Sequence, residues 1–247
     1  MASFGKERAL AETAARKAGA ALSARGDDFL GVDSAEGRDI KLKADKAAEA
    51  IIIDVLSGGS DYPILSEETG WTAEEGDICW VVDPLDGSAN YNKEIPFCCT
   101  SIALVKNGQP VVGVIFDFNH DDLYSGEVGD SATLNGRPMS VSAIDAKKNA
   151  ILFTGLPLNG DFSAEALGAM AAAFADWKKV RMMGTAATSI AMVSCGKAER
   201  YHETGIMIWD VAAGCALVEA AGGRVAISDG PLDVPKTVTA DNGRLGD

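Results

Sequence analysis

Hydrophobic and polar positions in the first half of the chain follow two different periods. Residues 3–25 and 43–57 repeat their apolar side chains at helical spacing and are followed by glycine, so each stretch predicts an amphipathic helix. Apolar runs of strand length come next, at 62–65, 78–83, 98–106, 110–118 and 122–125. Asn107-Gly108 separates neighbouring runs, which is typical of a tight hairpin. The first half therefore predicts helices followed by an antiparallel meander.

From about residue 149 the pattern changes to strands that alternate with helices. The expected strands are 150–154, 179–183, 198–203, 224–227 and 237–240, and the expected helices are 163–175, 185–196 and 209–221. This rhythm is typical of a sheet covered by helices. We therefore expect an α+β lobe at 1–148 and an α/β lobe at 149–247, with a cleft between them.

Composition narrows the class of protein. At 247 residues the chain is long enough to bury a large core, and its net charge of −14 argues against nucleic-acid or acidic-membrane partners. The sequence lacks a run near the roughly 18 apolar residues of a membrane span, and its first residues lack the apolar part of a secretory signal. Cys98 and Cys99 are expected on opposite faces of a strand as reduced core thiols, which suits a cytoplasmic protein.

The most informative stretch is WVVDPLDGSAN, at residues 80–90. An apolar strand is expected to end at Asp83, and Pro84 keeps that residue extended while Asp86 turns back toward it. Converging carboxylates repel each other unless a cation lies between them, and oxygen ligands suit Mg²⁺, Mn²⁺ or Ca²⁺. Residues 87–89 then open a helix whose N–H groups face an anion. The stretch predicts a metal beside a phosphate, although Asp-Pro and Asp-Gly are also common in surface turns.

Further acidic positions have ordinary structural explanations when taken singly. Glu67-Glu68 follows the apolar run at 62–65 and fits a surface loop. Asp210 and Asp45 stand where helices are expected to begin and fit N-caps. None of these positions by itself indicates a site.

Together, the acidic and glycine-containing motifs resemble those of the inositol monophosphatase family. The matching elements are Glu67-Glu68, Asp83-Pro84-Leu85-Asp86-Gly87-Ser88-Ala89-Asn90, Gly184-Thr185-Ala186-Ala187, Trp209-Asp210-Val211-Ala212-Ala213-Gly214 and Glu219-Ala220-Ala221-Gly222-Gly223. They follow the family's order over most of the chain, from about Asp45 to Arg224. The resemblance implies an αβαβα layered sandwich, dependence on Mg²⁺ that Mn²⁺ can replace, inhibition by lithium and a homodimer.

The same resemblance assigns roles to individual residues. Its metal ligands are Glu67, Asp83 and the Leu85 carbonyl for a first ion, Asp83, Asp86 and Asp210 for a second, and Glu68 and Asp45 for a weaker third ion held through water. Ser88 and Glu67 would orient and deprotonate the attacking water, while the N–H groups of Gly87 and Ser88 bind phosphate. The implied reaction is in-line attack of water on a small phosphate ester, without a covalent intermediate.

The residues implied to bind the substrate are similar to those of the inositol-phosphate branch. They are Gly184, Thr185 and Ala186 beside ring hydroxyls, Glu203 as an acceptor from those hydroxyls, and Asp210. Gly184-Thr185 also fits a turn and helix cap, and Glu203 also fits a solvated glutamate at a strand end before the turn Thr204-Gly205. Fructose 1,6-bisphosphate, 3'(2'),5'-bisphosphate nucleotides and histidinol phosphate remain alternative substrates. A regulatory binding protein on the same fold remains the alternative of another class.

The chain departs from the family pattern at particular points. Ser88 stands where the family usually has threonine, which keeps the hydroxyl but loses the restriction that a β-branched side chain places on χ1. The loop at 71–77 is expected to be short, which puts the third metal ion in doubt.

Overall fold

The computed structural model describes residues 3–26, 31–36, 39–156 and 160–246. Its helices are α1 (Gly5–Ala24), α2 (Lys43–Gly59), α3 (Ser88–Asn92), α4 (Ala164–Phe174), α5 (Ala186–Ser194) and α6 (Ile208–Ala220), with a 3₁₀ turn at Lys147–Asn149. Among the described residues, none of the helices has both the length and the apolar composition needed to cross a membrane.

The strands form a large sheet, a smaller sheet and a separate hairpin. The large sheet has the spatial order β10 (Arg137–Pro138), β9 (Ala132–Leu134), β8 (Asp122–Glu127), β7 (Gln109–Asp117), β6 (Cys99–Lys106), β5 (Ile78–Asp86), β3 (Ile64–Ser66) and β4 (Gly70–Trp71). The smaller sheet has the order β12 (Lys179–Arg181), β11 (Ile151–Phe153), β13 (Arg200–Ile206), β15 (Lys236–Asp241) and β14 (Arg224–Ile227), and β1 (Val32–Glu36) pairs with β2 (Asp39–Leu42).

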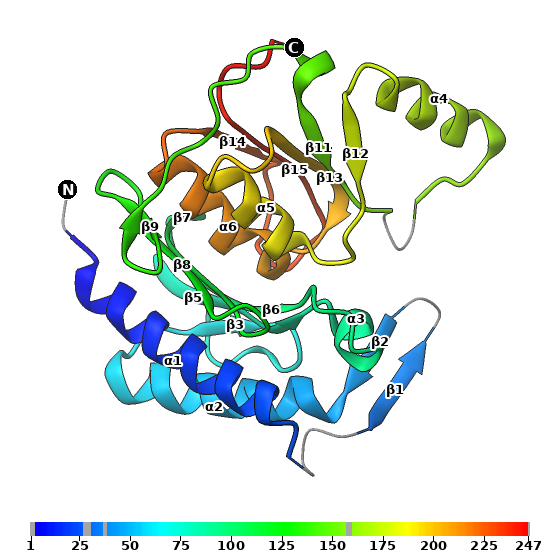
Figure 1. The fold of residues 1–247 in the computed structure, drawn as a ribbon. Helices are drawn as coiled ribbons and strands as arrows, with labels where there is room; N and C mark the ends of the chain where they lie inside the picture. Colours follow the sequence, from blue (N-terminus) through cyan, green and yellow to red (C-terminus); the bar gives the residue numbers. More distant parts are fainter. Residues whose placement is uncertain (1–2, 27–30, 37–38, 157–159, 247) are drawn as a thin grey trace.

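These elements stack in five layers. Figure 1 shows α1 and α2 below the large sheet, α5 and α6 between the two sheets, and α4 beyond the smaller sheet. The fold is therefore the expected αβαβα sandwich. Each face of the large sheet has its own apolar cluster, and Cys98 belongs to the cluster under α1 and α2 while Cys99 belongs to the one under α5 and α6. The expected placement of these buried free thiols on opposite faces is confirmed.

Small residues let α6 lie directly on the large sheet. A Cβ at Gly113 in β7 would overlap the carbonyl of Ala213 in α6, and a Cβ at Gly214 would overlap the Ile190 side chain of α5. Because Gly113 has no side chain, the α6 backbone approaches the sheet closely, and Gly214 allows the same approach between α6 and α5. This approach brings the first turn of α6, which carries Asp210, toward the end of β5.

The predicted helices and most predicted strands are confirmed, with differences at their ends. Strand β5 does not stop at Asp83 but continues to Asp86, and its pairing with β6 shifts by one residue between these positions, which is a β-bulge. Strand β13 continues to Ile206, so the expected turn at Thr204-Gly205 is wrong and appears instead as an irregularity within the strand. The β1–β2 hairpin was not predicted, because β1 has no alternation of apolar residues and the alternation in β2 covers only four residues.

Candidate active site

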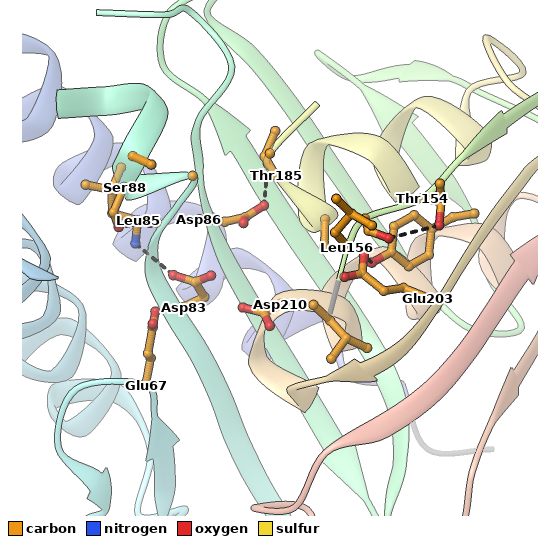
Figure 2. Close-up of a pocket in the computed structure, with 17 residues that line it drawn as sticks. Glu67, Asp83, Leu85, Asp86, Ser88, Thr154, Leu156, Thr185, Glu203 and Asp210 are labelled. Carbon is orange, nitrogen blue, oxygen red and sulfur yellow. Dashed lines mark hydrogen bonds between the residues drawn. The ribbon is translucent and has the colours of Figure 1, made fainter. Parts of the chain in front are cut away.

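A cavity of about 280 Å³ lies where the two sheets meet the first turns of α3, α5 and α6. Strands β11, β12 and β13 run parallel, so their carboxyl ends meet at one edge of the smaller sheet, which is a common place for ligand sites. The cavity is lined by Glu67, Asp83, Leu85, Asp86, Gly87, Ser88, Ala89, Thr154, Gly155, Leu156, Gly184, Thr185, Ala186, Tyr201, Glu203, Ile206 and Asp210. Figure 2 shows Glu67, Asp83 and Ser88 on one side of this cavity and Thr154, Leu156 and Glu203 on the other.

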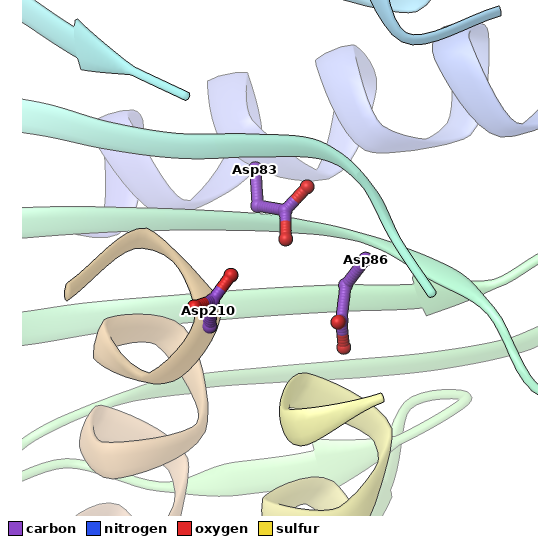
Figure 3. A group of neighbouring side chains, drawn as sticks. All are labelled: Asp83, Asp86 and Asp210. Atoms are coloured by element: carbon purple, nitrogen blue, oxygen red, sulfur yellow. The ribbon is translucent and has the colours of Figure 1, made fainter. Parts of the chain in front are cut away.

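Three aspartates, two from β5 and one from α6, converge in the cavity. Carboxylate oxygens of Asp83, Asp86 and Asp210 lie within 4.8 Å of one another (Figure 3). The β5 bulge produces this arrangement, because the extra residue places both of the strand's aspartates beside the third one in α6. Among the described residues, no lysine or arginine lines the cavity. The cluster therefore offers oxygen ligands to a hard cation, the donor set that Mg²⁺ prefers.

Burial and mutual repulsion disfavour the charged forms of these groups. Burial, followed by the charges of Glu67, Asp86 and Asp210, holds the pKa of Asp83 well above its ordinary value. Burial and the charges of Glu67 and Asp86 act in the same direction on the pKa of Asp210. Burial raises the pKa of Asp86 to about 6, against hydrogen bonds that lower it. A bound cation would reverse these shifts, because it favours the ionised carboxylates.

The first turn of α5 holds the Asp86 carboxylate. Asp86 Oδ2 accepts hydrogen bonds from the Thr185 hydroxyl and from the Ala187 N–H, the latter at 2.7 Å. Thr185 is the N-cap of α5, and its Oγ1 also accepts from the Thr188 N–H at 3.3 Å. The helix-cap explanation for Thr185 is therefore correct, and the cap also orients a proposed metal ligand.

Asn90 connects this turn to the other side of the cavity. Its Nδ2 donates to the carbonyls of Phe97 and Met183, each at 2.8 Å. Gly184 has a φ of +70°, which a residue with a side chain rarely adopts, and a Cβ there would lie 3.2 Å from Asn90 Nδ2. Glycine at position 184 therefore allows the backbone to turn just before Thr185.

We expect Thr185→Val to weaken activation by Mg²⁺ by about 10–100-fold, because it removes the hydroxyl that orients Asp86. The measurement is phosphate release over a Mg²⁺ titration. Thr188→Val is the matched control, since Thr188 is a buried threonine of the same helix, and the described hydrogen bonds to Asp86 from α5 come from Thr185 and Ala187 instead. Thr185→Ser should restore most of the activation, and equal Mg²⁺ dependence in Thr185→Val and the wild type would contradict the positioning role.

The Ser88 hydroxyl is hydrogen-bonded to the carboxylate of Asp45, which does not line the cavity. Its Oγ lies 2.8 Å from Asp45 Oδ1 and 2.9 Å from the Leu85 carbonyl, both within donating distance of the hydroxyl. Asp45 is not the expected N-cap of α2, which is Leu42, but it caps the helix from the third helical position by accepting from the Leu42 N–H. Burial raises the pKa of Asp45 to about 6, against those two hydrogen bonds.

Glu203 has a hydrogen-bond partner that the sequence did not predict. Its Oε2 accepts from the Tyr201 hydroxyl at 2.7 Å, and both residues line the cavity. A Cβ at Gly155 would overlap the Glu203 carboxylate, so the glycine leaves room for that group. Burial raises the pKa of Glu203, while the bond from Tyr201 lowers it. Glu203 is thus half-buried within the cavity and is not a fully solvated glutamate.

The structure brings most of the predicted site residues together. Every one of them lines the cavity except Asp45 and Glu68. Asp45 lies behind Ser88, and the charge of Glu68 is near enough to raise the Asp45 pKa. The cavity is also lined by residues that were not predicted from the sequence: Thr154, Gly155, Leu156, Tyr201 and Ile206. The carboxyl end of the predicted strand at 150–154 was the available signal for Thr154 and its neighbours.

Comparison with known proteins agrees with this geometry. The model of the inositol monophosphatase family matches residues 6–246. The "Nus factor SuhB" of Xylella fastidiosa is 40% identical over 80% of this chain and 72% of its own, and the "Inositol-1-monophosphatase" of Mesorhizobium japonicum is 36% identical over 94% and 87%. The solved inositol monophosphatase of Anabaena superimposes with a TM-score of 0.81, at 33% identity over 95% of this chain and 90% of the other. The chain thus belongs to the inositol monophosphatase family of phosphatases.

Proposed function

We propose that the protein is a Mg²⁺-dependent phosphomonoester hydrolase that releases phosphate from inositol monophosphate. The observation that carries this proposal is the convergence of Asp83, Asp86 and Asp210 in a cavity with no lysine or arginine among its described lining residues. A phosphate ester bound there needs positive charge, and a metal cluster is the source that these carboxylates favour.

The residues divide into the ligand sets that the family resemblance implies. Glu67, Asp83 and the Leu85 carbonyl would hold one ion, and Asp83, Asp86 and Asp210 would hold another. When bound, Mg²⁺ or Mn²⁺ would neutralise phosphate charge and lower the pKa of a water ligand. Glu68 and Asp45 remain the candidates for a third ion, although neither side chain lines the cavity.

The chain's own groups would bind the phosphate and remove a proton from the attacking water. The Ser88 hydroxyl would accept that proton while donating its own to Asp45, whose Oδ1 lies 2.8 Å from Ser88 Oγ. With a pKa of about 6, Asp45 is largely ionised at pH 7 and can receive it. Glu67, at the edge of the cluster, is the other candidate base. The backbone N–H groups of Gly87 and Ser88 would bind the phosphate where α3 begins.

The test is phosphate release from a panel of esters with Mg²⁺ or with EDTA. The panel contains inositol monophosphate, fructose 1,6-bisphosphate, a 3',5'-bisphosphate nucleotide and histidinol phosphate. The proposal predicts Mg²⁺-dependent hydrolysis with inositol monophosphate preferred. A fully folded protein that hydrolyses none of these esters would favour the regulatory binding class, to which the name "Nus factor" of one relative points.

We expect Glu203→Gln to raise KM for inositol monophosphate several-fold, because a charged acceptor for ring hydroxyls becomes a neutral amide. The amide oxygen can still accept from Tyr201, so the surrounding contacts are kept. An aryl phosphate, which lacks ring hydroxyls, serves as the control substrate and should be hydrolysed with little change. Equal effects on both substrates would remove Glu203 from the alcohol-binding part of the site.

We also propose that the protein forms a homodimer in the cytoplasm. Free cysteines support a reducing compartment. Among the described residues, four exposed large apolar side chains belong to the segment 156–182, which carries α4 and β12: Leu156, Phe162, Leu167 and Met182. Leu167→Glu combined with Met182→Glu should yield monomers by size exclusion with light scattering, whereas Val234→Glu, at an exposed apolar position elsewhere, should not. A monomeric wild type would reject the dimer.

A further inference from the structure

A second cavity, of about 530 Å³, lies between α4 and the outer face of the smaller sheet. Helix α4 has the sequence AEALGAMAAAF, and none of its residues is buried. Because most of its side chains are single methyl groups, the helix covers the sheet without filling the space beneath it. The space is larger than the proposed catalytic cavity.

The two sides of this second cavity differ in chemistry. The helix side presents Met170, Phe174 and Trp177, which are apolar and largely aromatic. The strand side presents polar groups, including His202 and Thr239, whose Nδ1 and Oγ1 atoms lie 2.8 Å apart. This combination fits an uncharged ring that packs one face on the aromatic side chains and directs polar edges to the strands.

Arg200 does not make this cavity an anion site. Its guanidinium pairs with Asp241 at 2.8 Å, and its Cζ lies 5.7 Å from the centre of the Trp177 ring. Burial and the charge of Arg200 lower the pKa of His202, so its imidazole is neutral at pH 7. Lys147 and Asp176 also line the cavity and carry opposite charges, and the remaining carboxylate, Glu203, accepts a hydrogen bond from Tyr201. The lining therefore favours a neutral occupant.

The second cavity borders the proposed catalytic cavity. Thr154, Gly155 and Glu203 line both. Thr154 and Gly155 directly follow β11, where the chain leaves the sheet, and Glu203 lies within the neighbouring strand β13. In Figure 2 Thr154 and Glu203 lie together on the side of the catalytic cavity away from Ser88. An alcohol that extends from the aspartate cluster past Glu203 would arrive at this border.

We propose that the second cavity receives the distal part of the leaving alcohol, so that the enzyme also accepts phosphate esters whose alcohol carries an uncharged aromatic ring. This inference rests on the proposed phosphatase activity. It extends the substrate class beyond simple polyol phosphates and gives the aromatic side of α4 a role in substrate selection.

The test compares n-butyl phosphate with 4-phenylbutyl phosphate, which share a primary alkyl leaving group and differ only in the distal ring. We expect kcat/KM to be about tenfold higher for the phenyl ester, because its ring leaves water for the second cavity. Ala173→Met fills space in this cavity and should remove most of that advantage by raising KM, with butyl phosphate unaffected. Ala172→Met is the matched control, since Ala172 is an exposed neighbour that does not line the cavity.

Equal kcat/KM for the two esters, or the same loss in Ala172→Met as in Ala173→Met, would overturn the inference. Inositol monophosphate is included in every assay. Hydrolysis of inositol monophosphate without any preference for the phenyl ester would reject the second cavity as a substrate site and leave the phosphatase proposal intact. Absence of phosphate release from all three esters would reject the phosphatase proposal itself.

Discussion

Replacing either Asp83 or Asp210 with asparagine is expected to lower phosphate release by about 10²–10⁴-fold, because each change removes charge that several proposed metal contacts need. The same variants should melt at an unchanged or higher temperature in EDTA. Burial and neighbouring carboxylates hold the pKa values of both groups well above the ordinary range, so the amide relieves repulsion in the metal-free protein. The measurements are initial rates over a Mg²⁺ titration and thermal unfolding in EDTA.

A buried aspartate outside the cavity provides the control. Asp117 is 5% exposed and accepts hydrogen bonds from the N–H groups of Asn119 and His120. Asp117→Asn should therefore change activity little, whatever its effect on stability. Full activity in Asp210→Asn, or in wild-type protein with EDTA, would contradict the metal-dependent mechanism.

The metal-free protein is expected to lose stability as the pH rises from about 4 to about 7. Asp45 and Asp86 have pKa values raised from 3.8 to about 6 in the folded state, so between these values the folded protein binds more protons than the unfolded chain. Stability then falls with rising pH, by roughly 3 kcal/mol for each of these groups. Asp83 and Asp210 extend the loss to higher pH, because burial and repulsion raise their pKa values further.

Mg²⁺ should reverse this dependence, because a ligand of the folded state adds stability and binds best to ionised carboxylates. Chemical denaturation at several pH values, with EDTA and with saturating Mg²⁺, measures both effects. Asp86→Asn should have a shallower dependence on pH in EDTA than the wild type. Identical pH profiles with and without Mg²⁺ would show that the aspartate cluster does not bind the ion.

Much of the fold could be predicted because its signals are local. Helical periodicity indicated α1 and α2, and Asn107-Gly108 indicated the β6–β7 hairpin, which the pairing of Lys106 with Gln109 confirms. The end of β5 could not be placed, because the proline and the bulge resemble a chain turn in sequence. The extension of β13 was missed for a similar reason, since Gly205 suggests a break that pairing with β15 bridges.

In the candidate site, too, the features with local sequence signals could be predicted and those that depend on distant residues could not. The sequence by itself determined the acidic motifs, their order and the family, because Asp83-Pro84-Leu85-Asp86-Gly87-Ser88 places its ligands within one short segment. The sequence could not determine which residues form the hydrogen bonds that orient those ligands. Thr185 reaches Asp86 across 99 positions and Ser88 reaches Asp45 across 43, with no local pattern that pairs them.

Only the tertiary structure decided these pairings and the raised pKa values of the carboxylates. A side chain's type and its neighbours in sequence set its possible chemistry. Its hydrogen-bond partners, the charges near it and its contact with water are set by elements that meet only after the layers pack. For this chain, the close packing of α5 and α6 between the sheets brings separate acidic residues into one largely buried cluster beside a cavity.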